Sequence, residues 1–221
     1  MKEFFTTERM IDANDWATVL FVLCLGLVAV ARTVFEKRFA DFSRLLVSDK
    51  YLKVYKDSGH LVNGFTTLLF LVQLTSFAFF IQIALAHFDY GIKTDWLLFV
   101  RIFTLLGVFI LSKFLVDKII GAAFKIDDVA EQYNLRKVSY RTYLGLLLLP
   151  INIILFYSYN VSDLFLFIFI PAVLIINMLT YLLSLRNYET FIGGKLFYFI
   201  LYLCALEIAP YYFMYYWFTK N

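Results

Sequence analysis

The chain has 221 residues, of which 62% are hydrophobic and 20% aromatic, with a mean hydropathy of +0.76 and a formal net charge of +3. Soluble domains are about half apolar, so this composition excludes an ordinary soluble domain and indicates an integral membrane protein. We expect no nucleic-acid partner. The positions of the charges along the chain say more about membrane topology than the net charge does.

The first apolar segment, residues 16–31, contains no charged residue. It is slightly shorter than the roughly 20 residues that a membrane-spanning helix needs. A cleaved signal peptide is the alternative, because the Ala-Val-Ala that ends at Ala31 resembles a cleavage site. However, four acids and two bases precede the segment, and bases such as Arg32 and Lys37 follow it. This charge bias predicts a retained span whose C-terminal end lies in the cytoplasm.

Residues 32–60 are charged but carry apolar side chains at helical spacing, namely Phe35, Phe39, Phe42, Leu45 and Leu46. We expect a helical segment with one of three placements. It extends the first helix into the cytoplasm, it lies along the inner membrane surface with its bases near lipid phosphates, or it packs on the protein's own cytoplasmic face.

Five further apolar segments are long enough to predict membrane-spanning helices, at residues 61–86, 96–116, 142–159, 164–185 and 196–218. A second charged segment, 117–141, separates the third span from the fourth, and short loops join the others. At its start, we expect Lys113 to reach the inner surface and Asp117, one turn later, to pair with it.

The Lys and Arg residues are distributed unequally over the two sides of this arrangement. One side, taken as the cytoplasm, holds 15 of the 20 bases: Arg32, Lys37, Arg38, Arg44, Lys50, Lys53, Lys56, Lys113, Lys118, Lys125, Arg136, Lys137, Arg141, Arg186 and Lys195. Lys and Arg in short loops decide orientation. We therefore predict one all-α polytopic membrane domain, residues 1–221, with six transmembrane helices, two charged cytoplasmic helical segments and both termini outside.

Motifs of soluble enzymes are absent from the sequence, which has no glycine-rich phosphate loop and no HExxH, CxxC or GxSxG. His60 and His87 lie at opposite ends of the second span, so they cannot share a haem or a metal ion. Cys24 and Cys204 lie in apolar segments, where a cysteine usually serves as a small hydrophobic residue. We expect no catalytic residue, no metal and no cofactor.

Prolines and polar side chains within the spans are the next candidates. Three prolines predict helix kinks, either around an internal cavity or in curved packing: Pro150, Pro171 and Pro210. Three amides would line a cavity or form interhelical hydrogen bonds: Gln82, Asn152 and Asn177.

The last predicted span contains a single charged residue, Glu207, 11 residues after Leu196. This spacing places Glu207 about 16 Å into the membrane, near its midplane. An ionised acid at that depth costs at least about 2.5 kcal/mol, so it must be paired or protonated. Arg101 lies about 8 Å inside the outer end of the third span and can reach inward. We predict an Arg101–Glu207 pair as the candidate intramembrane site.

Three roles for Glu207 stay open. It is a buried structural acid that fixes helix register, a proton or substrate site of a transporter, or a contact with a partner membrane subunit. A transporter would normally have a second intramembrane ionisable group, or a broken helix at matching depth in another repeat.

Three of the predicted spans each carry a different short motif: Asn14-Asp15-Trp16 at the first, Leu149-Pro150 in the fourth, and Leu206-Glu207-Ile208-Ala209-Pro210 in the last. Together they resemble a family of bacterial inner-membrane proteins of unknown function and of about this length. The resemblance covers nearly the whole chain. It implies the bacterial inner membrane and a six-helix fold. In that membrane, the two termini predicted to lie outside are periplasmic. It implies no activity and carries over no catalytic residue.

We therefore expect a non-enzymatic accessory or scaffolding subunit of an inner-membrane complex, such as one that serves protein export or envelope assembly. Its expected partners are the lipid bilayer, other membrane protein subunits, and anionic lipid head groups at the cytoplasmic basic segments. The alternative is a small proton-coupled transporter that uses Glu207. An enzyme that acts on lipid is disfavoured, because no cluster of His and Asp lies at one interface.

Overall fold

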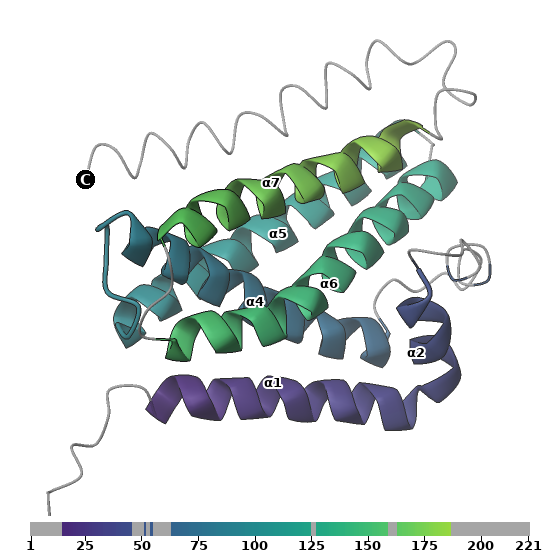
Figure 1. Cartoon of the computed structure of the whole chain (residues 1–221). Coiled ribbons are helices and arrows are strands. Elements are labelled where there is room, and N and C mark those ends of the chain that lie inside the picture. The colour runs from purple at the N-terminus through teal and green to yellow at the C-terminus, as the bar shows by residue number, and fades with distance from the viewer. Residues whose placement is uncertain are drawn as a thin grey trace, which may run out of the picture. The chain divides into compact units, whose positions relative to one another are not determined.

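The computed structural model describes residues 15–45, 51, 54, 63–124, 127–158 and 163–186, with side chains left out at 120–133, 163 and 181–186. This part of the chain consists of α-helices joined by turns and loops and has no strand, which confirms the predicted all-α fold class for it. Its helices are α1 (Asp15–Val34), α2 (Glu36–Ser43), α4 (Gly64–His87), α5 (Trp96–Phe124), α6 (Asp127–Tyr157) and α7 (Asp163–Arg186) (Figure 1).

Four of these helices are long and apolar enough to cross a membrane: Asp15–Val34, Gly64–His87, Trp96–Ile119 and Asn134–Tyr157. They correspond to the first four predicted spans. The fifth predicted span lies in α7, whose apolar part, Leu164–Thr180, is shorter. The sixth, 196–218, lies outside the described residues. The chain divides into two compact units, Met1–Thr180 and Tyr181–Asn221, and α1 to α6 belong to the first.

The second charged segment is divided between two helices. α5 continues to Phe124, eight residues beyond the predicted end of its span, and α6 already begins at Asp127. The stretch from Asp127 to Arg141 contains no glycine or proline, and residues such as Glu, Gln, Leu, Arg and Lys favour a helix. The charged residues therefore lengthen the membrane-type helices instead of forming a separate element.

The described start of the first charged segment, up to residue 45, turns back on the protein. The chain leaves helical geometry at Phe35, with φ −119° and ψ 45°, and α2 follows at an angle to α1 (Figure 1). Phe42 and Leu45 are almost completely buried in a cluster with Phe65 of α4 and Leu135 of α6. Of the three placements that the sequence left open, this packing favours the one in which α2 lies against the protein itself.

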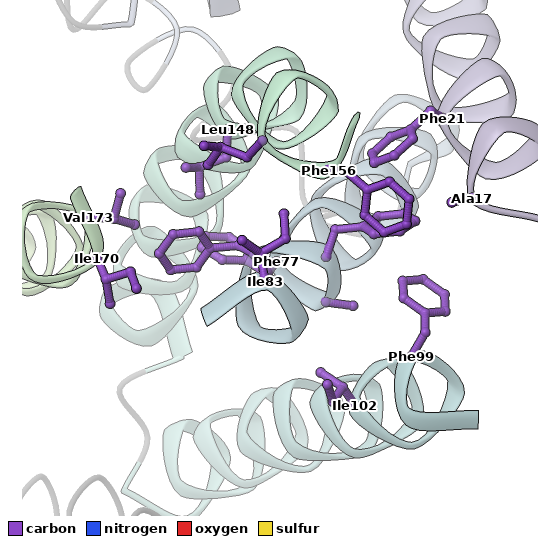
Figure 2. Close-up of a cluster of buried hydrophobic side chains, with 14 of the residues drawn as sticks. Ala17, Phe21, Phe77, Ile83, Phe99, Ile102, Leu148, Phe156, Ile170 and Val173 are labelled. Atoms are coloured by element: carbon purple, nitrogen blue, oxygen red, sulfur yellow. The ribbon is translucent and has the colours of Figure 1, made fainter. Parts of the chain in front are cut away.

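Helix α4 is the centre of the described bundle. In an apolar stretch of 18 residues within α4, 67% of the residues are buried, whereas 17% are buried in the matching stretch of α5. It contacts α1, α5 and α6, and side chains from four other helices, including Phe21, Ile102, Leu148 and Ile170, gather around its residues (Figure 2). A helix that is apolar on all sides suits this central position.

Phe79 lies at the centre of an aromatic cluster at the C-terminal end of α4. Its ring is fully buried and stacks on Phe21 of α1 at a centroid distance of 4.2 Å. Trp16, Phe99 and Phe156 surround it at 5.7, 4.6 and 5.6 Å. Aromatic pairs at these separations each add about 0.5–1.5 kcal/mol beyond the burial of area, so one ring joins α1, α5 and α6 to α4.

We expect Phe79→Ala to lower the free energy of unfolding by about 3–5 kcal/mol, because it empties a buried site that has four aromatic neighbours. Val22→Ala on α1 is the control, since Val22 is 63% exposed. Unfolding in mixed micelles of mild detergent and dodecyl sulfate would measure both. Equal, small losses from the two substitutions would contradict the central position of α4.

Candidate functional site

The described helices bury four polar side chains almost completely, at 0% exposure each: Gln73, Ser76, Gln82 and Asn152. Three of them come from α4 and one from α6. A buried polar group costs free energy unless it is hydrogen-bonded, and an apolar surrounding offers no water to bond it. The partners of these four residues therefore show what the polar groups in the bundle do.

Asn152 ties α6 to α4. Its Nδ2 donates to the backbone carbonyl of Ser76 at 2.8 Å and lies 3.2 Å from the Ser76 hydroxyl oxygen. Interhelical bonds of this kind contribute about 0.6 kcal/mol on average in membrane proteins, and up to about 1.7 kcal/mol. Of the two roles predicted for Asn152, the geometry matches the interhelical hydrogen bond.

Gln73 and Thr142 make a second contact between the same two helices. The Thr142 hydroxyl donates to Gln73 Oε1 at 2.7 Å. One turn after Thr142, Gly145 allows the backbones to approach closely, because a Cβ there would lie 2.9 Å from the Gln73 Cα. Small residues at such crossings are typical of helix pairs in membranes. We call Gln73, Ser76, Thr142, Gly145 and Asn152 the α4–α6 seam.

Gln82 fixes the other end of α4. Its Nε2 donates to the backbone carbonyls of Asp95 at 2.8 Å and Ile92 at 3.4 Å, in the loop that leads into α5. The amide thus holds the short turn between α4 and α5 against the helix. Gln82 therefore helps to fix the fold, as Asn152 does. Both side chains are buried between packed elements of the bundle.

Some bonding capacity in the seam is unused. Among the described residues, neither Gln73 Nε2 nor Asn152 Oδ1 has a hydrogen-bond partner, although both atoms are buried. An unsatisfied buried polar atom costs about 1–3 kcal/mol. The seam therefore retains polar atoms that a further hydrogen-bonding group could use.

The other predicted site residues are distributed along the bundle. Arg101 is exposed on α5, and Asn177 on α7 is half-buried, with its backbone carbonyl accepting from the Thr180 hydroxyl at 2.8 Å. Helices α6 and α7 continue through Pro150 and Pro171, both on exposed faces. Two predicted site residues, Glu207 and Pro210, lie outside the described residues, so the Arg101–Glu207 pair stays a prediction.

A pocket of about 380 Å³ lies between α4, α5 and α6. Its lining is largely apolar, with a charged end formed by Lys113, Asp117, Lys137 and Arg141, and we call it the basic pocket. Lys137 Nζ lies 3.8 Å from Asp117 Oδ2, and both side chains are mostly buried. This contact joins α5 to α6.

Neither the seam nor the basic pocket was predicted from the sequence. Gln73 and Ser76 are three residues apart in an apolar helix, and Lys137 and Arg141 are four apart, so each pair shares a helix face. These spacings were visible in the sequence. The partners across the interface were not, because they come from other helices.

The chain belongs to the family described as domain of unknown function (DUF4271), which matches residues 17–218. This confirms the resemblance to a family of unknown function, and the match covers nearly the whole chain. Searches of curated proteins and of solved structures find no match. The family description assigns no activity.

We expect Gly145→Ala to destabilise the protein by about 1–3 kcal/mol, because the new Cβ meets backbone and forces α4 and α6 apart. Gly26→Ala is the matched control, since nothing lies within 4 Å of a Cβ at that position on α1. It should be neutral or stabilising by up to about 1 kcal/mol. Thermal unfolding of both variants in detergent would decide, and equal stability of the two would contradict the close approach.

Proposed function

We propose that the protein is a non-enzymatic accessory or scaffolding subunit of an inner-membrane complex, such as one that serves protein export or envelope assembly. The observation that carries this proposal is the use of Gln82, Asn152 and Gln73 as bonds between helices and loops. These side chains hold the bundle together. A rigid frame that presents surfaces to neighbours is what a scaffold requires.

The proposed topology has six membrane-spanning helices, with both termini in the periplasm. It rests on the bias of Lys and Arg toward one side. Arg32 lies in the last turn of α1 and Lys118 in the last third of α5, so both bases fall at the proposed cytoplasmic ends of these helices. Four of the described helices are long and apolar enough to cross a membrane.

Two helices supply lateral surfaces that neighbouring subunits could cover. On α5, Val108, Leu115 and Ile119 are 61%, 57% and 66% exposed, and α1 presents a similar apolar face with Val19 and Val22. Lipid solvates such faces when the protein is alone. A partner helix replaces lipid there through close van der Waals packing, so α1 and α5 are the proposed contacts.

The second candidate is a small proton-coupled transporter that uses Glu207. The observation that favours it is the unused bonding capacity of Gln73 Nε2 and Asn152 Oδ1 within the α4–α6 seam. Polar atoms without partners inside a membrane bundle are expensive, and a transported group would satisfy them.

Purification in a mild detergent, followed by quantitative mass spectrometry, tests the proposal. We expect other membrane proteins to co-purify at fixed stoichiometry. Photo-cross-linkers placed at Val108 of α5 should label the same proteins, and cross-linkers at Phe99, which is 3% exposed, should not.

The transporter is tested in proteoliposomes with an imposed pH gradient. If the protein purifies alone and takes up protons in a way that Glu207→Gln abolishes, the scaffold proposal fails. Glu36→Gln is the matched control, since Glu36 is an exposed acid of α2.

A further inference from the structure

The basic pocket combines two surfaces that one membrane ligand would need. Its long wall is apolar and includes Phe70 and Leu71 of α4, with Leu111 and Phe114 of α5. Its charged end holds three bases and one acid, so the described lining has a formal charge of +2. Within this end of the pocket, Asp117 lies beside Lys137.

The depth of the pocket matches the boundary of a bilayer. Lys113 lies 17 residues after Trp96, the first residue of α5. At 1.5 Å per residue this is about 26 Å along the helix, close to the roughly 30 Å thickness of the hydrocarbon core. If Trp96 marks one surface of the core, the three bases lie near the other surface, where lipid phosphates are. The apolar wall then extends into the hydrocarbon layer.

We propose that the basic pocket binds an anionic phospholipid of the cytoplasmic leaflet. Lys113, Lys137 and Arg141 contact the phosphate, and an acyl chain lies against Leu71 and Leu111. Basic pockets between membrane helices on the cytoplasmic side suit anionic head groups. Free phosphate would use the bases but would leave the apolar wall uncovered, which is why the occupant is a lipid. The proposal depends on the membrane orientation given above and is independent of the scaffolding role.

The occupant would also have a structural effect. Its phosphate would contact bases of both α5 and α6, since Lys113 belongs to α5 and Arg141 to α6. Bound lipid would therefore strengthen the contact that Lys137 and Asp117 already make between these helices. Anything that binds the folded protein and not the unfolded chain raises stability by mass action.

Native mass spectrometry of the full-length chain in a neutral detergent tests the proposal, with phosphatidylglycerol as the probe and phosphatidylcholine and inorganic phosphate as comparisons. We expect phosphatidylglycerol to bind preferentially and to raise the melting temperature. Lys113→Gln and Arg141→Gln should each weaken binding about fivefold, the effect of one base near a lipid phosphate. Lys118→Gln is the matched control, because Lys118 is an exposed base of α5 outside the pocket.

A second pair of variants tests the apolar wall without changing charge. Leu111→Trp should fill the pocket and reduce phosphatidylglycerol binding severalfold, whereas Leu115→Trp should not. Both positions are exposed, at 52% and 57%, so both variants should fold.

Equal binding of phosphatidylcholine, or binding that neither Lys113→Gln nor Leu111→Trp changes, would overturn the proposal. Inorganic phosphate that competes with the lipid at equal concentration would show an anion site in place of a lipid site and would overturn it too. None of these outcomes bears on whether partner subunits co-purify.

Discussion

The structure depends on one constraint, which is that a polar group inside an apolar environment costs free energy unless the protein itself bonds it. The constraint acts most strongly on helix α4, because this helix buries Gln73, Ser76 and Gln82 completely. Its partners must therefore bring donors or acceptors to it. Helix α6 does so with Thr142 and Asn152, and the loop before α5 does so with its carbonyls.

The outer helices follow from that arrangement. Once α6 and the α4–α5 loop hold α4, aromatic packing at Phe79 adds α1 and α5, and α2 covers the opposite end through Phe42. The faces of α1 and α5 that point away from α4 remain apolar and exposed. These faces suit lipid or a neighbouring subunit. This is how a fold requirement leads to the proposed role as a scaffold.

Sequence analysis predicted the elements better than their contacts. Apolar runs located the four long apolar helices because hydropathy is a local property. The helix from Asp127 to Tyr157 crosses the predicted boundary at residue 142 because charged residues also favour helices.

The basic pocket was not predicted, since Lys113 and Arg141 are far apart in the chain and meet only when α5 and α6 pack. Asn152 was identified as a polar candidate, but its partner on α4 depends on helix register. The pairing of Arg101 with Glu207 is still a prediction, as Glu207 lies outside the described residues.

The bond between Asn152 and Ser76 can be observed directly in bilayers by solid-state NMR. With ¹⁵N-labelled asparagine and serine labelled at the carbonyl carbon, a through-space correlation should join Asn152 Nδ2 to the Ser76 carbonyl. Their separation should be about 4 Å or less, given the 2.8 Å hydrogen bond, and the correlation should disappear in Asn152→Leu. No such correlation, together with rapid exchange of the Asn152 amide with deuterated water, would show an open polar cavity between α4 and α6 and would contradict a bonded central helix.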